Sequence, residues 1–221
     1  LDAGQCCLFL DDSSLCQVYN NVAETDASIR AVKDTYGLVP TYRGTLIVPM
    51  TFNTSFGTTC TNAEIWGGDA YSYLESNVEN PDKDKIDLSD EADFEAFLTD
   101  SDAYTIIDKD SPYYRWDITF TQEEMTDAIE TVLENRKSLM AEAILVEDET
   151  GEFVSADVPE LGTVTEIEVA ERTVSGVVSK LVIHGSEHTI SISGQSNIRA
   201  ILNPVNQEIV LHKGRREMCY T

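Results

Sequence analysis

The spacing of apolar residues along the 221-residue chain predicts short helices in its first part. Residues 25–37 predict a helix, because Ile29, Val32 and Tyr36 share one face and Thr25 is a suitable N-cap. Residues 90–98 predict a second, acidic helix. Ser89 is its expected cap, and three residues are expected to face inward: Phe94, Phe97 and Leu98.

The strongest helical pattern begins at Thr121. "TQEE" is a capping box, in which Thr121 and Glu124 bond to each other's backbone N–H groups. The residues that follow form one apolar stripe, made by Met125, Ile129, Val132 and Leu133. This stripe is typical of core packing. A last short helix is predicted in "QSNIRAILNP", which Pro204 ends.

β-strand patterns occupy the rest of the periodic sequence. "LVPTY" and "TLIVPMTF" are joined by Arg43-Gly44, which predicts a tight hairpin. Beyond Gly162 we expect four more strands, in "TVTEIEVAERT", "GVVSKLVIHG", "HTISISG" and "QEIVLHKG". The whole pattern predicts an α+β fold with an antiparallel β-rich core and a few short helices.

Two segments lack such a period. Residues 53–74 are rich in Gly, Thr, Ser, Asn and aromatic residues, so we expect a long loop or a set of turns that is suited to carry function. Residues 76–104 are strongly acidic, and we expect a peripheral insertion there. The sequence has no Pro- or Ser-rich segment that would mark a linker between domains. Residues 1–221 are therefore expected to form a single domain.

The charge of the chain narrows the possible functions. Forty acidic and 15 basic residues give a net charge of −25, which disfavours binding to nucleic acid. The acidic stretches are typical of a solvated surface, and they lack the spacing of a calcium-binding loop. No apolar run reaches the roughly 20 residues of a membrane span. The chain opens on "LDAGQCCLFL", without a Met or a basic flank, so we expect a mature form or part of a longer chain.

Few residues stand out as candidates for chemistry. His184 and His188 flank an expected hairpin turn, where surface histidines are a simpler reading than a zinc site. Cys16 has no histidine near it in sequence that would activate it as a nucleophile. The five cysteines are odd in number, and their pairing stays open. The carboxylates are too many to single out a catalytic pair.

The order of several motifs carries more information than any one of them. The first half holds Gln17-Val18-Tyr19, Ala31 to Gly37, Tyr42 to Ile47, Ser55 to Gly57, Trp66-Gly67-Gly68 and Tyr73-Leu74. The second half holds "SPYYRWDITFTQEEM", "ERTVSGVVSKLVIHG" and "ISISGQSNIRAIL". In this order, over residues 11–75 and 110–213, the chain resembles the stage II sporulation protein D and amidase-enhancer (LytB) family. The later segments correspond to the family's R-x-x-S-G strand and its G-x-x-x-I-R helix.

The chain also departs from the family pattern. The catalytic glutamate of the family lies in a G/S-E-M-P motif upstream of Gln17, and this chain begins too late to include it. The C-terminal G-H-G-x-G-M-S-Q is missing as well. Some members carry a zinc-type C-D-x-x-H-C, but here Asp11 and Leu15 replace two ligands and only Cys16 is left. We therefore expect no metal and no cofactor, and the catalytic residue is unknown.

The resemblance implies a bacterial, extracytoplasmic protein of the cell wall, in the envelope or secreted, that binds or remodels peptidoglycan glycan strands. Full-length relatives would act as lytic transglycosylases in sporulation, so this chain is an enzyme only if a catalytic glutamate lies outside it. One alternative is a non-enzymatic amidase enhancer that binds the wall or a wall hydrolase. Another is an acidic surface or interaction protein that shares only the fold. The expected sugar-binding residues are Ser13, Gln17, Tyr19, Ser55, Trp66 and Tyr73. Packing is the competing role for the aromatic residues among them.

Overall fold

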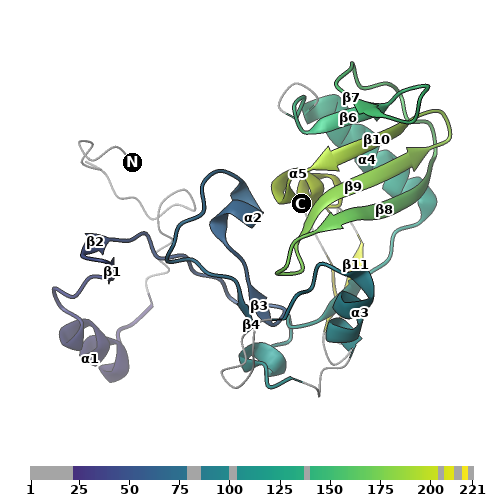
Figure 1. The fold of residues 1–221 in the computed structure, drawn as a ribbon. Helices are drawn as coiled ribbons and strands as arrows, with labels where there is room; N and C mark the ends of the chain where they lie inside the picture. Colours follow the sequence, from purple (N-terminus) through teal and green to yellow (C-terminus); the bar gives the residue numbers. More distant parts are fainter. Residues whose placement is uncertain are drawn as a thin grey trace. The chain divides into compact units, whose positions relative to one another are not determined.

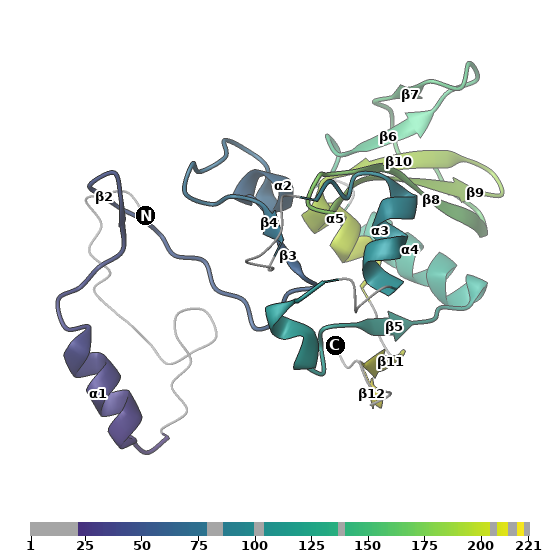
Figure 2. The ribbon, with the colours of Figure 1, turned by 60° about the horizontal axis from the view of Figure 1, so that its bottom comes forward.

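The computed structural model describes six stretches of the chain, which are residues 22–78, 86–99, 104–136, 140–203, 207–211 and 216–218. The chain divides into two compact units, Leu1–Met50 and Thr51–Thr221, which we call the N-terminal unit and the C-terminal unit and describe separately. Most helices and strands are labelled in Figure 1, and β5 and β12 are labelled in Figure 2. No helix in the described stretches has both the length and the apolar character that a membrane span requires.

In residues 22–50, the part of the N-terminal unit that the structure describes, there are one helix and one hairpin. Helix α1 (Asp26–Asp34) begins after the predicted N-cap Thr25, whose hydroxyl accepts the Ser28 N–H at 3.1 Å. Strands β1 (Thr41–Tyr42) and β2 (Thr45–Leu46) pair in antiparallel fashion. Both turn residues have positive φ, +49° at Arg43 and +82° at Gly44, as a type I′ hairpin requires. The predicted helix and hairpin are confirmed, but no residue of α1 is buried.

The larger sheet of the C-terminal unit has five antiparallel strands in the order β7-β6-β10-β9-β8. Their bounds are Ile144–Glu147 for β6, Phe153–Val154 for β7, Val164–Arg172 for β8, Val178–Gly185 for β9 and Thr189–Ser193 for β10. Helices α4 (Gln122–Arg136) and α5 (Gln195–Ile201) lie on one side of this sheet (Figure 2). The predicted helix at Thr121 and the β8, β9 and β10 strands are confirmed.

The sheet and the two helices enclose an aliphatic cluster, which we call the sheet core. Ile129 and Leu133 of α4 and Ile198 and Ile201 of α5 are buried in it. The sheet contributes, among others, Ile144, Val164, Leu181, Ile183, Ile190 and Ile192. Met125 and Val132 of α4 pack at its border, so the apolar stripe predicted from the sequence faces the core.

A second buried cluster, which we call the aromatic cluster, lies in less regular structure. Its buried members are Leu88, Phe97, Ile106 and Tyr114, and Phe56, Ile86, Phe94 and Tyr104 pack against them. Helix α3 (Glu91–Thr99) and the 3-10 helix η1 (Ile107–Asp110) belong to this region. Leu88 and Phe97 come from the stretch expected to be a peripheral acidic insertion. Within residues 86–99, therefore, that stretch is part of a buried cluster and not only a solvated surface.

The described residues of the unit also form two smaller sheets. Strands β12 (Arg216–Met218), β11 (Glu208–Leu211) and β5 (Trp116–Ile118) form one of them, and β3 (Thr58–Thr59) and β4 (Asn77–Val78) form the other. Strand β11 confirms the last predicted strand. The pattern of apolar residues did not predict β5, β6 or β7.

The N-cap of α3 differs from the expected one. The Asp90 carboxylate accepts the backbone N–H groups of Ala92 at 2.9 Å and Asp93 at 3.3 Å, so Asp90 caps the helix in place of Ser89. Ser89 instead donates to Asp87 through its hydroxyl at 2.6 Å. Both residue types suit an N-cap, so the sequence alone could not separate two adjacent candidates.

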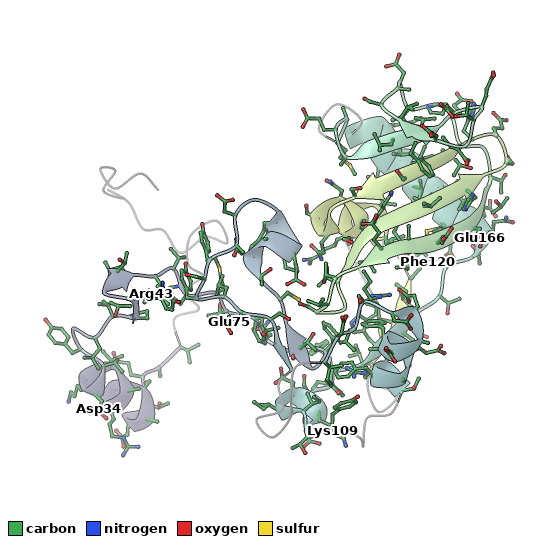
Figure 3. The ribbon with its side chains drawn as sticks, in the orientation of Figure 1. Asp34, Arg43, Glu75, Lys109, Phe120 and Glu166 are labelled. Atoms are coloured by element: carbon green, nitrogen blue, oxygen red, sulfur yellow. The ribbon has the colours of Figure 1, made fainter. Side chains whose placement is uncertain are left out.

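Strand β8 is one edge of the five-stranded sheet. Its pairing with β9 is interrupted by register shifts at three places, between Val164 and Glu166 and twice between Val169 and Arg172. The Glu166 side chain marks this edge in Figure 3. At the start of the strand, α4 supplies hydrogen bonds to the edge. The Gln122 side-chain amide donates to the Val164 carbonyl, and the Val164 N–H donates to the Thr126 hydroxyl.

Candidate functional site

A cleft of about 470 Å³ lies in the C-terminal unit. Three segments that are far apart in sequence line it: helix α2 (Asn62–Trp66), the ends of β8 and β9 near their connecting turn, and the start of α5. Figure 1 shows α2 and α5 close to the β8–β9 connection. The lining residues are Ala63, Glu64, Ile65, Trp66, Gly67, Thr173, Ser179, Gly194, Gln195, Ser196 and Asn197.

Helix α2 is short and is fixed at both ends. Thr61 and Glu64 form a capping box, in which the Thr61 N–H donates to Glu64 Oε2 at 2.7 Å and the Glu64 N–H donates to Thr61 Oγ1 at 3.3 Å. Gly67 ends the helix with a φ of +75°, which favours glycine. Trp66, the last helical residue, is consequently held at the cleft with 63% of its surface exposed.

The α2 region also holds the segment after it. The Asn62 side chain accepts the Tyr71 N–H at 2.7 Å and donates to the Asp69 carbonyl at 2.9 Å. Tyr71 and Tyr73 stack with their ring centroids 5.4 Å apart. The stretch 53–74, expected to be a loop or a set of turns, therefore contains a short strand, a capped helix and a turn that is anchored on Asn62.

The turn between β8 and β9 forms the second wall, and neighbouring segments hold it. The Gly176 N–H donates to the Thr173 carbonyl at 2.9 Å, which closes the turn. The Thr58 hydroxyl donates to the Ser175 carbonyl at 2.9 Å, and the Leu88 N–H donates to the Val174 carbonyl at 3.0 Å. The turn is thus tied both to β3 and to the aromatic cluster.

Arg172 connects the same turn to α3. Its guanidinium forms a two-pronged pair with the Glu91 carboxylate at 2.7 and 2.9 Å and lies 3.7 Å from the centre of the Phe94 ring. It also donates to the Gly176 carbonyl at 2.6 Å. Gly176 has a φ of +87°, and a Cβ there would lie 2.8 Å from the Phe94 ring. This position therefore requires glycine for its conformation and for its close packing.

A hydroxyl and carboxylate network joins the first two walls. Ser175, which is buried, donates from its hydroxyl to Glu64 Oε1 at 2.6 Å, and Ser76 Oγ lies 2.7 Å from Ser175 Oγ. The Thr61 hydroxyl donates to Glu64 Oε2 at 2.9 Å. Glu64 is therefore fixed by partners on both carboxylate oxygens.

This network keeps Glu64 charged. Burial raises the pKa of its carboxyl group, but hydrogen bonds from Ser175 and Thr61 and the nearby Thr173 hydroxyl outweigh that effect and lower it overall. Thr173 Oγ1 is buried and has no hydrogen-bond partner within ordinary geometry. Burial, followed by the Glu64 charge, raises the pKa of the Cys60 thiol to about 11, so this thiol stays protonated and unreactive.

The start of α5 forms the third wall. Gly194 precedes the helix with a φ of +90°, and its N–H donates to the Ser179 carbonyl at 2.9 Å. The Asn197 side-chain amide donates to the Ser193 carbonyl at 2.9 Å. These bonds hold the first turn of α5 against β9, and Gln195, Ser196 and Asn197 line the cleft from there.

The cleft receives one of the six predicted sugar-binding residues, Trp66. Ser55 and Tyr73 do not line it. Ser55 instead receives a hydrogen bond at its hydroxyl from the Gly57 N–H and donates its own N–H to Asp108. Ser13, Gln17 and Tyr19 lie outside the described residues, as does Cys16.

The two histidines take the positions that the sequence predicts, at the two ends of the β9–β10 connection. His184 Nε2 lies 3.8 Å from Glu168 Oε2, and His188 Nδ1 lies 2.9 Å from the Glu160 carbonyl. In the described stretches, no group of three or more His, Cys, Asp and Glu residues is placed to hold a metal ion.

Sequence reasoning missed most of the cleft. Neither Glu64 nor its partner Ser175 is among the predicted site residues. The sequence nevertheless contains a recognisable motif at each of these two residues. "TNAE" is a capping box like "TQEE", and the R-x-x-S-G segment at residues 172–176 contains Ser175.

The family of this chain is established by sequence comparison. Residues 60–216 match a family described as "Domain of unknown function (DUF8618)", and because the match covers most of the chain, the chain belongs to this family. No curated protein and no solved structure matches the chain. The matched residues include every segment that lines the cleft.

Proposed function

We propose that the C-terminal unit binds glycan strands of peptidoglycan in this cleft. The observation that carries the proposal is that three separate segments behind the family resemblance lie at one site. Trp66 and Gly67 come from the first, Thr173 from the R-x-x-S-G segment, and Gly194 to Asn197 from the G-x-x-x-I-R segment. A common role in binding one ligand would explain why these three segments, far apart in sequence, all match the family pattern.

The chemistry of the lining suits sugars. Besides Glu64, the polar side chains that are accessible in the cleft are hydroxyls and amides, from Ser179, Gln195, Ser196 and Asn197, which can donate to and accept from sugar hydroxyls. The exposed Trp66 indole offers an apolar face for the C–H face of a pyranose ring. Sites for small polar ligands combine such an aromatic surface with a few placed polar groups.

The same chemistry favours binding without cleavage. A lytic transglycosylase needs a carboxylic acid that keeps its proton near neutral pH. In the described part of the chain, the carboxyl groups whose pKa is shifted all have it lowered, namely Glu64, Asp87, Glu124 and Asp148. Cleavage by a longer form of the protein would require an acid from outside the residues described. The proposed target places the protein in the cell envelope or outside the cell, without assigning it to sporulation.

The test is binding to purified sacculi and to oligomers of N-acetylglucosamine, with two tryptophan variants. Trp66 and Trp116 are both more than half exposed, but only Trp66 lines the cleft. We expect Trp66→Ala to weaken binding by about tenfold or more, the usual effect of losing an aromatic anchor, and Trp116→Ala to leave it unchanged. Equal losses in both variants, or no binding by the parent protein, would refute the proposal. Soluble anhydro-sugar products would show that the chain also cleaves.

A further inference from the structure

We propose that the sugar bound next to Glu64 carries a free, positively charged amine, as glucosamine does, and not an N-acetyl group or a carboxylate. This inference rests on the proposed function and specifies the ligand of the same cleft. It predicts a preference for N-deacetylated stretches of glycan.

The first support is the charge of the lining. Glu64 is the one charged side chain among the eleven lining residues, and no Lys, Arg or His stands with it. The cation nearest in sequence to the turn, Arg172, is 7% exposed in its side chain and is already paired with Glu91. A ligand carboxylate, such as the lactyl group of muramic acid, therefore meets an anion without a compensating cation at this position.

The second support is the geometry of Glu64. Its Oε1 accepts from Ser175, and its Oε2 accepts from the N–H and the hydroxyl of Thr61. A carboxylate offers about four lone-pair sites, so about one remains for a ligand N–H. Because its own partners already hold the side chain, a ligand ammonium gains a charge-assisted hydrogen bond with little ordering of Glu64.

The third support is the field of the whole protein. A net charge of −25 raises the local concentration of cationic ligands and lowers that of anionic ones. An N-acetylated amine is neutral, so the negative potential of the protein does not attract it. A protonated free amine has a positive charge and three N–H donors. The long-range attraction is not specific to the cleft, so the experiment must separate it from the contact with Glu64.

The experiment compares the affinities of a glucosamine tetramer and an N-acetylglucosamine tetramer for the protein by calorimetry at about pH 6, where exposed carboxylates are ionised. We expect the glucosamine tetramer to bind about tenfold more tightly, the order of one charge-assisted hydrogen bond. Glu64→Gln should remove this preference, so that the variant binds the two tetramers with similar affinity. Gln at this position still suits a capping box, and circular dichroism checks that the fold is intact.

The matched control is Glu149→Gln, which removes the same charge from an exposed position outside the cleft. It should leave the preference in place. An equal loss in both variants would assign the preference to the general field and overturn the role of Glu64. Tight binding of both tetramers without preference would overturn this inference but not the proposed function, and binding of neither would overturn both.

Discussion

The C-terminal unit contains two buried clusters that are built in different ways. The sheet core is aliphatic and joins regular strands and helices through their apolar faces. The aromatic cluster joins a helix, a 3-10 turn and irregular segments. In the sheet core, the hydrogen bonds of the strands and helices hold the backbone in place. In the aromatic cluster, side chains must provide some of the hydrogen bonds that hold the irregular backbone.

Two arginines supply those groups. Arg115 donates to the Phe56 carbonyl at 2.6 Å and to the Leu98 carbonyl at 3.3 Å near the end of α3, and its guanidinium carbon lies 3.8 Å from the centre of the Tyr114 ring. Burial lowers the pKa of Arg115, but the group stays charged. Arg172 makes comparable contacts at the other side of α3, with Glu91 and Phe94. The comparison shows that a guanidinium can donate hydrogen bonds to backbone carbonyls that have no partner within a strand or a helix.

The largest expected effect comes from deleting residues 79–102, which would remove Phe97, Leu88 and the Arg172 partner Glu91. We expect a loss of about 5 kcal/mol or more, because burial of a single large apolar side chain contributes roughly 2–5 kcal/mol. Such a loss approaches the whole stability of an ordinary domain. Denaturant unfolding followed by near-ultraviolet circular dichroism measures it.

The control for the deletion keeps the buried residues and removes only charge. Asp93→Asn with Glu95→Gln should change the free energy of unfolding by no more than about 0.5 kcal/mol, as exposed substitutions usually do. A deleted protein that unfolds with unchanged stability would show that the aromatic cluster is dispensable and that this acidic stretch is peripheral after all.

The next largest effect concerns the sheet core. Ile183 is 0% exposed, and Ile183→Ala should lower the free energy of unfolding by about 2–5 kcal/mol, since it leaves a cavity between the sheet and its helices. Ile107 is 77% exposed, so Ile107→Ala is the matched control and should have little effect. Chemical denaturation of both variants checks this, and similar losses would contradict the assigned core.

A smaller effect is expected from Arg115→Met. This variant keeps much of the apolar stem but leaves the carbonyls of Phe56 and Leu98 without their donor. We expect a cost of about 1–3 kcal/mol, the usual penalty for a buried polar group left without a partner. Arg43→Met, at an exposed turn of the N-terminal unit, is the control. Equal stability of Arg115→Met and the parent would mean that packing alone maintains the aromatic cluster.

The smallest effect is a dependence of stability on pH. The pKa of Glu64 is lowered from 4.5 in the folded protein, so its stabilising contribution is present above the unfolded pKa and is lost as pH falls through the folded value. Thermal unfolding of the parent and of Glu64→Gln should therefore differ at neutral pH and converge in acid. Glu149→Gln should show no such convergence, and a difference for Glu64→Gln that grows as pH falls would reverse the assigned sign.

The elements that the sequence predicts are those whose apolar residues repeat regularly. Helix α4 and strands β8 to β10 show clear periods, and the Arg43-Gly44 turn has a specific composition. For the aromatic cluster, the sequence predicted that Phe94 and Phe97 face inward, as they do. It did not predict the rest of the cluster, because those contacts join irregular segments and depend on arginine bonds to carbonyls. The cleft was only partly predictable: Trp66 was named, but Ser175 reaches Glu64 across 111 positions, and no local pattern reports such a pair.

The edge strand β8 has a further consequence for the behaviour of the protein at high concentration. A straight, apolar edge of nine residues would offer its backbone to a strand of another molecule and promote aggregation. Here the interrupted register, the glutamates at 166, 168 and 171 and the side-chain bonds from α4 to Val164 all disfavour that pairing. We therefore expect the sheet to resist growth by strand addition, so that concentrated solutions remain clear while this edge stays intact.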